Sequence, residues 1–581
     1  MTDPPATDLP ATGATVPEAP APVFVLHGHF YQPPRENPWT DVVSMEPSAA
    51  PYPNWNARIT AECYRPNGWA RILDERGLVV GIVNNYAYLS FNVGPTLLSW
   101  LEQHEPSVYA RILEGDREGG GAIAQAYNHV ILPLANERDV RTQVRWGLAD
   151  FAHRFGRPAE GMWLPETAVN EATLAVLAEE GVRFVTLAPH QAVRVRPLPD
   201  TAGATPAGRA ASGSVGRWVE VPNGSIVVHR PYRWLHPTNP SLGLDIVFYD
   251  GPFSHEIAFA TGTMTAEDLA ARVRAASVEG GMLCAAADGE TFGHHHRFTE
   301  RSLAYALPVA IPRDGLRVGT LASVLREHRP VWQVEVQESS WSCVHGVGRW
   351  QSDCGCSTGG VEGANQAWRR PLRDALDLVR DHGIEVFERR GAKVLTDPWA
   401  ARDAYIQVLL GASDRDRFVA EHVVDAGADE VKVREALTLL EHQRQAMLMY
   451  TSCGWFFWDL AGLETVQILR YAAKSMDLLV ELGEDPQLEA FLDVLGEAQS
   501  NVEGEGNGRQ VWEHHVMTAR VDAQRALAVR RLAQNLGMNL DVGQAQELVY
   551  EALTSGEGSP ELRSLGQELG LDTDHLGIPK P

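Results

Sequence analysis

The sequence predicts an α/β protein in which a (β/α) barrel is followed by an all-helical region. Between Val23 and about Arg329, short apolar runs alternate with amphipathic segments, a pattern typical of a parallel sheet covered by helices on both faces. Seven or eight such units over roughly 300 residues favour a barrel over an open sheet. From Trp368 to about Leu569, segments rich in Leu, Glu, Arg and Ala have the pattern of a helical bundle.

The expected elements can be placed in order along the chain. The expected strands are Val23–His27, Val79–Asn84, Gly121–Tyr127, Gly161–Leu164, Val182–Ala188, Ser225–His229, Leu244–Tyr249 and Met282–Ala287. The expected helices include Thr96–Leu113, Glu137–Phe155 and Asn170–Glu180 in the barrel, and Asp429–Met449 and Leu463–Leu482 behind it. Pro199–Gly216, rich in Gly, Ala, Pro and Thr, is expected to be a surface loop.

A chain of 581 residues is too long for one ordinary hydrophobic core, so several domains are expected. Changes in composition divide it into four parts. These are a disordered Pro- and Ala-rich tail over 1–22, the barrel domain over 23–333, a loop rich in Trp, Cys and Gly over 334–367, and a helical domain over 368–581.

Composition and charge argue against several classes of function. The formal net charge of −25, without any basic stripe, argues against a nucleic-acid partner. No run of roughly 18 or more apolar residues is present, and residues 1–22 lack the features of a signal peptide, so we expect no membrane partner and a cytoplasmic location. The six cysteines are expected to be reduced. No cofactor is expected, and the oligomeric state stays open.

Two carboxylates follow expected strands. Glu166, in GMWLPETAVN, comes after Gly161–Leu164, and Asp288, in AAADGETFG, comes after Met282–Ala287. Barrel enzymes place their sites at the carboxyl ends of strands, and glycosidic cleavage needs one protonated and one ionised carboxyl group. Either carboxylate alone is equally well explained as a helix cap or an ion-pair partner. Two of them, each amid Trp, His and Gly, favour a catalytic pair.

Five short motifs lie in or beside this framework. They are LHGHFYQPP (Leu26–Pro34), GAIAQAYNHVILP (Gly121–Pro133), WLPE (Trp163–Glu166), ADGETFG (Ala287–Gly293) and SSWSCVHGVGRW (Ser339–Trp350). Together they resemble the motifs of glycoside hydrolase family 57, which includes α-amylases, 4-α-glucanotransferases and branching enzymes. The last motif has Ser342 where the family's Ser-Trp-Gly loop has glycine.

The resemblance implies both a fold and a mechanism. The fold is an incomplete (β/α)7 barrel of the TIM type, followed by an all-helical C-terminal domain. The mechanism is retaining, with Glu166 as the nucleophile and Asp288 as the general acid/base. The expected substrate is an α-linked glucan, and either water or another sugar is the acceptor.

Six further side chains are expected to contact the substrate. His27, His29 and His129 can hydrogen-bond sugar hydroxyls, or can instead satisfy groups at strand ends. Trp163 can stack on a sugar ring or belong to the core, and Trp341 can cover the cleft. Asp250 can orient the substrate or compete for the acid role, and so can Glu290, which we rank below Asp288.

A Cys- and His-rich segment suggests a second kind of chemistry. Cys343, His345, Cys354 and Cys356 make a Cys3His zinc set possible, although their C-x-H and C-x-C spacings are tighter than usual. The simpler expectation is a reduced, Gly-rich loop with no metal. His294, His295 and His296 are not expected to hold one ion, because adjacent side chains point in different directions.

Two other functions stay open at this point. A metal-dependent polysaccharide deacetylase or mannosidase-like hydrolase on a related barrel would use ligands such as His27, His29, His129 and Asp250. A glycan-binding protein that has lost turnover would keep the barrel without its chemistry. Sensitivity to chelators distinguishes the first of these, and binding without turnover distinguishes the second.

Overall fold

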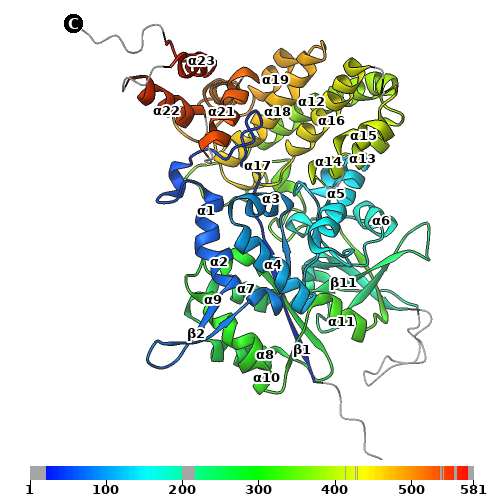
Figure 1. Cartoon of the computed structure of the whole chain (residues 1–581). Helices are drawn as coiled ribbons and strands as arrows, with labels where there is room; N and C mark the ends of the chain where they lie inside the picture. The colour runs from blue at the N-terminus through cyan, green and yellow to red at the C-terminus, as the bar shows by residue number, and fades with distance from the viewer. Residues whose placement is uncertain are drawn as a thin grey trace, which may run out of the picture.

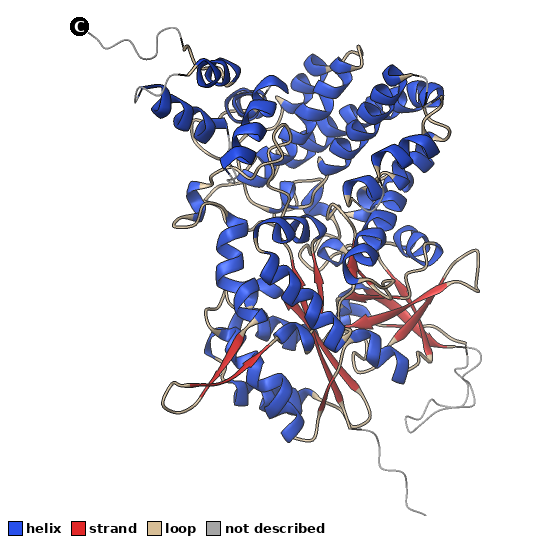
Figure 2. Ribbon diagram, viewed as in Figure 1, coloured by secondary structure: helices blue, strands red, loops and turns tan. Residues whose placement is uncertain are grey.

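The computed structural model describes residues 21–198, 216–411, 414–425, 427, 429–521, 523–536, 540, 542–554 and 559–573. Nearly all of the expected tail over 1–22 and of the expected loop Pro199–Gly216 therefore lie outside the described residues. The strands gather in one half of the molecule, and the other half consists of helices, as Figures 1 and 2 show. This is a mixed α/β architecture with a helical C-terminal half.

Seven parallel strands follow one another around the first half. Strand β1 (Val23–Phe30) pairs with β12 (Met282–Asp288) on one side and with β4 (Ser90–Val93) on the other. Isolated parallel bridges connect β4 to β5 (Ala124–Gln125), and β6 (Met162–Trp163) to β7 (Phe184–Leu187). Strand β5 pairs with β6, and β7 pairs with β11 (Gly243–Phe248). The Asp250 N–H, just after β11, donates to the Cys284 carbonyl of β12 over 2.7 Å. The order of these strands therefore curves back towards its start.

A second sheet extends from β11. Strand β11 also pairs, antiparallel, with β10 (Tyr232–Leu235). The sheet continues through β14 (Trp332–Val336), β8 (Ala192–Pro197) and β9 (Val219–Glu220). The chain leaves β14 into a long irregular segment over 337–368, named here the 337–368 loop, before the helical half begins.

Two of the expected barrel strands are wrong. Val79–Asn84 overlaps β3 (Val79–Val83), which belongs to a two-stranded hairpin with β2 (Ala70–Leu73) and leaves Val80 64% exposed. Ser225–His229 forms no strand. The strand that follows β1 in space is β4, which the apolar pattern missed because its sequence SFNV carries the buried polar residues Ser90 and Asn92.

The helices of the first half largely follow the expected ranges, with one break at a proline. The expected helix Thr96–Leu113 is two helices, α3 (Pro95–His104) and α4 (Pro106–Gly119), because Pro106 lacks the N–H that a helix interior needs. Helix α5 (Glu137–Phe155) is confirmed, and α6 (Glu171–Glu179) is confirmed to within a residue at each end. The remaining elements here are α1 (Trp55–Ile59), α2 (Arg65–Gly68), α7 (Gly251–Ala260), α8 (Ala266–Ala276), α9 (Thr299–Tyr305), α10 (Ile311–Arg313), α11 (Leu321–Glu327) and β13 (Arg317–Val318).

Three long helices organise the second half. Helix α16 (Glu430–Leu448) packs between α12 (Arg369–Val394) and α18 (Leu463–Glu481), as expected from their apolar stripes. The other helices are α13 (Pro398–Ala404), α14 (Ile406–Leu409), α15 (Arg415–His422), α17 (Cys453–Phe456), α19 (Leu488–Leu495), α20 (Gly508–Val511), α21 (Ala523–Leu536), α22 (Val542–Thr554) and α23 (Pro560–Glu568). Within the described part of the chain, we find no helix long and apolar enough to span a membrane.

The two halves are joined by buried contacts. Arg402 of α13 reaches Asp139 of α5 over 2.7 Å, and both side chains are largely removed from solvent. Beside the barrel, Val130 and Thr451 form an antiparallel bridge. The segment that precedes α17 is therefore held against the ends of the barrel strands.

Candidate active site

The carboxyl ends of three neighbouring strands place polar side chains in one row. In the register of the parallel pairs, His29 of β1 lies opposite Asp288 of β12 and opposite Asn92 of β4. Residues at matching positions of parallel strands project to the same face of the sheet, and these three lie near the carboxyl ends of their strands, where barrel enzymes place their sites. Asp288 is therefore set beside His29, as the sequence led us to expect of strand-end residues.

Glu166 lies across from this row, in the turn Pro165–Thr167 that follows β6. Its backbone is left-handed, with a φ of 58°, and Thr167 has a φ of 48°. Non-glycine residues rarely adopt this conformation, and in proteins they concentrate at functional sites. The turn directs Glu166 towards the 337–368 loop instead of along α6.

Two donors on the 337–368 loop hold one oxygen of Glu166. The Trp341 Nε1–H donates to Glu166 Oε2 over 3.0 Å, and the Ser342 hydroxyl donates to the same oxygen over 2.7 Å. The Trp341 backbone N–H also donates to the Glu166 carbonyl over 3.0 Å. Among the residues that the structure describes, Glu166 Oε1 has no hydrogen-bond partner. One carboxylate oxygen is thus anchored and the other is left free.

The two carboxyl groups have different electrostatic surroundings. Burial raises the pKa of Glu166, whereas the hydrogen bonds from Ser342 and Trp341 and the charge of Arg349 oppose that rise. The Asp288 side chain is exposed, but the protein atoms around it disfavour its charged form, and the nearby Glu166 charge adds to the effect. Together they raise the pKa of Asp288 to about 7. Near neutral pH, Asp288 can therefore exchange a proton, and the hydrogen bonds from Ser342 and Trp341 favour the ionised form of Glu166.

Glu290, the third carboxyl group, lies behind Asp288. It is 6% exposed and accepts hydrogen bonds from the Tyr64 hydroxyl and from the Tyr31 backbone N–H. Burial, helped by the Asp288 charge, raises the pKa of Glu290 to about 8. A buried group that is mostly neutral and already bonded to Tyr64 is less suited than Asp288 to exchange protons with a substrate.

His27 and His29 are part of a buried polar network. His27 Nε2 lies 3.1 Å from Asn92 Oδ1, and His29 Nδ1 lies 3.3 Å from the same oxygen. Asn92 in turn donates to Gln125 Oε1 over 2.7 Å. Burial lowers the pKa of His27 to about 4 and that of His29 to about 3, so both rings are neutral near pH 7. Neutral imidazoles offer the site hydrogen bonds, not positive charge.

Trp163 packs against the rings of both histidines. It is fully buried and stacks on His27 and His29, with ring centroids 4.7 and 5.0 Å apart. It has no exposed ring face for a sugar, so the structure gives it a positioning role in place of the stacking role considered above. Trp341, which is partly exposed, meets it edge-on at 5.1 Å.

His129 is held by the helical half of the chain. The Ser452 hydroxyl lies 2.7 Å from His129 Nδ1, and the Ser452 N–H donates to the His129 carbonyl over 3.0 Å. His129 Nε2 faces His29 Nε2 at 3.2 Å, and the Tyr31 ring stacks on His129 at 3.7 Å. Burial lowers the pKa of His129 well below its usual value. The three expected histidines therefore come together around His29.

Asp250 has a structural task. Its carboxylate accepts a hydrogen bond from the Phe253 N–H over 2.9 Å and caps the N-terminus of α7. This bond uses one carboxylate oxygen for a helix cap, and the expected part of Asp250 in orienting the substrate or in acid catalysis stays a prediction. Its backbone still closes the gap between β11 and β12.

The two histidine-containing segments outside the site behave differently. In the first, His294 Nδ1 lies 2.5 Å from Glu62 and His296 Nε2 lies 3.0 Å from the Ala258 carbonyl, so adjacent rings face different partners, as expected. In the second, one ligand atom from each of Cys343, His345, Cys354 and Cys356 lies within 4.8 Å of the others.

Several site residues were missed by sequence reasoning. Asn92 was missed with its strand, and Ser452 lies in a segment that was not singled out for chemistry. Tyr31 lies within the motif LHGHFYQPP but was not itself singled out. For Ser342 a signal was present: it replaces a glycine of the family's loop, and its hydroxyl reaches Glu166.

Two family models match the chain. The model described as glycosyl hydrolase family 57 matches residues 56–337, and a domain of unknown function (DUF3536) matches residues 365–556. The first match covers most of the barrel and ends just after β14, and the second begins just before α12. No match was found among curated protein sequences.

Two solved structures align with most of the chain. An exo-type maltose-forming amylase from Pyrococcus sp. ST04 is 16% identical, with a TM-score of 0.58 over 88% of this chain and 94% of that chain. A GH57 branching enzyme from Thermococcus kodakaraensis is 15% identical, with a TM-score of 0.48 over 81% of this chain and 94% of that chain. At such identities the first likeness supports the fold alone.

Proposed function

The chain belongs to glycosyl hydrolase family 57 through its residues 56–337, and from this premise we propose that it is a retaining glycoside hydrolase or glycosyl-transferring enzyme acting on α-linked glucan. The substrate class is the commonest one in the family, and the amylase of similar fold is in keeping with it. Glu166 is the nucleophile and Asp288 the general acid/base.

One observation carries the catalytic part of the proposal. Glu166 has Oε2 fixed by Trp341 and Ser342 while Oε1 is free, and desolvation together with the nearby charge of Glu166 raises the pKa of Asp288 to about 7. A retaining enzyme needs this division of labour: an ionised, oriented carboxylate and a second carboxyl group that is protonated near neutral pH.

The reaction follows from these two groups. Glu166 Oε1 attacks the anomeric carbon and forms an ester bond to the sugar, while the glycosidic C–O bond breaks and Asp288 gives its proton to the leaving oxygen. In the second half, ionised Asp288 takes a proton from water or a sugar hydroxyl. That oxygen attacks the anomeric carbon and releases Glu166. Two inversions give net retention.

The fold also suggests how the chain divides into domains around the site. We propose that the curved set of seven parallel strands is the incomplete (β/α)7 barrel of the family and forms a catalytic domain over 23–333. In this division the segment 334–367 walls the cleft, and 368–581 is a helical domain that reaches the site through Ser452.

The first experiment is product analysis with maltooligosaccharides and soluble starch. We expect turnover with retention of anomeric configuration by proton NMR, and its loss in Glu166→Gln. Glu171→Gln is the matched control, because Glu171 also accepts an indole N–H, from Trp234 over 2.7 Å, but lies on α6 outside the proposed pair. Turnover surviving in Glu166→Gln would reject the assignment.

Azide separates the two roles. In Glu166→Ala, azide can enter the vacated space and attack directly, which gives a glycosyl azide of inverted configuration. In Asp288→Ala, azide intercepts the glycosyl-enzyme and gives the retained anomer. The same anomer from both variants would contradict the assignment.

One observation favours the metal-dependent alternative: His29 Nε2 and His129 Nε2 face each other at 3.2 Å. Asp250, the carboxylate that would complete such a ligand set, uses one of its two oxygens to cap α7. Deacetylation of an acetylated oligosaccharide that depends on an added divalent metal would support this alternative. Tight glycan binding that is unaffected by Glu166→Gln, without turnover, would support a protein that only binds glycans.

A further inference from the structure

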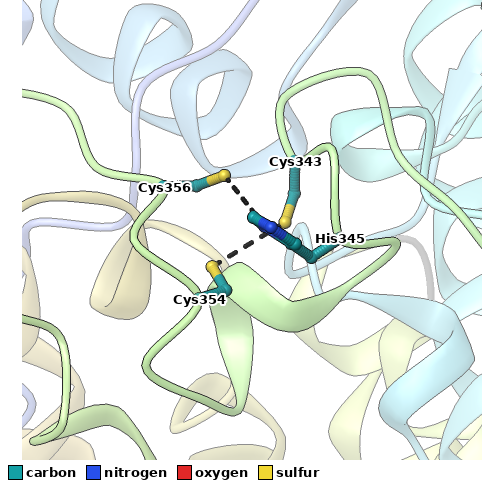
Figure 3. A group of neighbouring side chains, drawn as sticks. All are labelled: Cys343, His345, Cys354 and Cys356. Atoms are coloured by element: carbon teal, nitrogen blue, oxygen red, sulfur yellow. Dashed lines mark hydrogen bonds between the residues drawn. The ribbon is translucent and has the colours of Figure 1, made fainter.

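The 337–368 loop gathers four side chains with metal-binding atoms at one point. Cys343 and His345 lie in the first part of the loop, and Cys354 and Cys356 lie about ten residues further along it. Figure 3 shows all four side chains directed towards one centre. Cys343 Sγ lies 3.9 Å from Cys354 Sγ, and Cys356 Sγ lies 3.6 Å from His345 Nδ1. Cys343 is buried, and the other three are half-buried or exposed.

These two distances match those between ligand atoms of a tetrahedral zinc site. Zinc binds thiolate sulfur at about 2.3 Å and imidazole nitrogen at about 2.0–2.1 Å. In a regular tetrahedron those lengths place two sulfurs about 3.8 Å apart and a sulfur and a nitrogen about 3.6 Å apart. We propose that Cys343, His345, Cys354 and Cys356 bind a structural zinc ion, with four protein ligands and no open position.

Glycines explain how such short spacings can serve one ion. Gly355, between Cys354 and Cys356, has a φ of 79°, which turns the chain so that both thiols reach the same centre. A Cβ on Gly348 would lie 3.2 Å from the Cys354 Cβ and 3.4 Å from the His345 Cβ. The two arms of the loop therefore pack closely across a glycine.

A buried cation provides a second, independent reason. Three thiolates, one neutral imidazole and Zn²⁺ carry a net charge of −1. The guanidinium of Arg369, at the start of α12, is fully buried, and no carboxylate lies within ion-pair distance of it among the residues that the structure describes. Its Nη1 lies 3.8 Å from Cys354 Sγ and donates to the Cys356 carbonyl over 2.8 Å. An unpaired buried charge is costly, and a zinc–thiolate centre would supply the missing anion.

A disulfide explains less of this arrangement. A disulfide between Cys343 and Cys354 would not account for the contact between Cys356 and His345. Because a disulfide is neutral, it would also leave the positive charge of Arg369 without a counter-charge. The zinc centre uses all four groups and the cation.

The position of the site suggests what the ion does. Cys343 directly follows Trp341 and Ser342, the two donors to Glu166 Oε2. A zinc ion would fix the far end of this short segment and so hold both donors in place. This consequence rests on the proposed function, whereas the zinc site itself does not.

Metal content of the purified full-length protein tests the proposal. We expect one zinc per chain by mass spectrometry of metals after purification under reducing conditions without chelator, and loss of it in Cys354→Ser. Cys453→Ser is the matched control, because Cys453 is a half-buried cysteine outside the cluster, and it should keep its zinc. A reduced wild-type protein that neither contains zinc nor takes it up when it is supplied would overturn the proposal, whether or not the variants fold.

Cobalt substitution identifies the ligands without reference to activity. Co²⁺ in the site should give the intense visible bands of tetrahedral thiolate coordination. His345→Cys should retain metal and shift those bands towards a four-thiolate spectrum, whereas His345→Ala should bind metal more weakly. Octahedral, weakly coloured cobalt, or a spectrum unchanged by His345→Cys, would show that the metal binds elsewhere. A protein that holds zinc in this way but cleaves no glucan would reject only the proposed function.

Discussion

Ser342 and Glu166, which are 176 residues apart in sequence, are joined by a hydrogen bond of 2.7 Å from the Ser342 hydroxyl to Glu166 Oε2. The bond connects the turn after β6 to the loop that follows β14, and Trp341 adds a second donor to the same oxygen. Hydrogen bonds to the charged form of a carboxyl group stabilise that form. The 337–368 loop therefore both orients Glu166 and favours its ionised state.

Removing this hydroxyl should impair the nucleophile without removing it. A hydrogen bond to a charged group contributes about 1.5–3 kcal/mol, so Ser342→Ala should lower kcat by roughly 10- to 150-fold. The loss also raises the pKa of Glu166, which moves the acidic limb of the kcat/KM profile to higher pH. Steady-state kinetics over pH on a maltooligosaccharide measures both effects. The control is Ser339→Ala, whose hydroxyl donates to the Gln337 carbonyl; an equal loss there would mean that general disturbance of the loop is the cause.

The pH profile should also report Asp288. Its pKa is raised to about 7, and it must be protonated in the free enzyme to act as the acid. kcat/KM should therefore fall as pH rises through about 7. Because the Glu166 charge contributes to the raised pKa, Glu166→Gln should lower the pKa of Asp288, measured by difference infrared or NMR titration. A pKa that does not respond to Glu166→Gln would mean that the two groups do not interact.

The same shift has a consequence for stability. The folded-state pKa of Asp288 lies above its ordinary value of 3.8, so its protonated form stabilises the folded protein at low pH, and that contribution is lost as pH rises through about 7. Asp288→Asn should therefore raise Tm relative to wild type more at pH 8 than at pH 4, by calorimetry.

The carboxylates were predictable from sequence because each follows a strongly apolar run and so stands at a strand end. Strand β4 was not, since its alternating Ser90 and Asn92 face a buried polar network and dilute the apolar signal, while the solvent-exposed hairpin strand β3 carries a stronger one. An apolar run therefore does not by itself identify a buried strand of the barrel.

The contacts that complete the site depend on tertiary structure. Ser452 meets His129 across 323 residues, and nothing in the local sequence of either predicts the pairing. The convergence of the four Cys and His side chains was not evident from sequence for a related reason. Spacing rules assume an ordinary turn, whereas the left-handed Gly355 brings Cys354 and Cys356 to one centre.

Substitution of Glu290 should lower kcat far less than substitution of Asp288. Glu290 is mostly neutral at pH 7, and glutamine would keep an oxygen to accept from Tyr64 and from the Tyr31 N–H. Glu290→Gln should thus change kcat by less than about 10-fold, whereas Asp288→Asn removes the acid and should cost roughly 10²–10⁴-fold. Substrates with good leaving groups should recover part of the first step only in Asp288→Asn. The reverse ranking of the two variants would transfer the acid role to Glu290.

The helical half should stabilise the site through the Ser452 hydroxyl, which lies beside His129 Nδ1. Ser452→Ala leaves the backbone bond to His129 intact but removes the partner of its buried Nδ1, a loss of about 1–3 kcal/mol in the free energy of unfolding. Urea denaturation and kcat/KM measure the two consequences. Ser475→Ala is the matched control, because the Ser475 hydroxyl is buried and has no hydrogen-bond partner within the described residues. Equal effects of the two substitutions would remove any special role for the Ser452–His129 contact.

A glycine at position 289, next to Asp288, should be required for full stability and activity. A Cβ at this position would lie 2.3 Å from Cδ1 of the Phe30 ring and 2.4 Å from its Cε1, so Gly289→Ala must displace either Phe30 or the strand end that carries Asp288. Such overpacking should destabilise the protein by about 1–3 kcal/mol and lower kcat further than stability alone explains. Gly81→Ala on the exposed hairpin, where the nearest atom would be 3.5 Å away, should change neither. The double variant Gly289→Ala with Phe30→Leu makes room for the added methyl group, and it should recover stability and activity together if Phe30 is the obstacle. Recovery of stability without activity would place the damage in Asp288 itself.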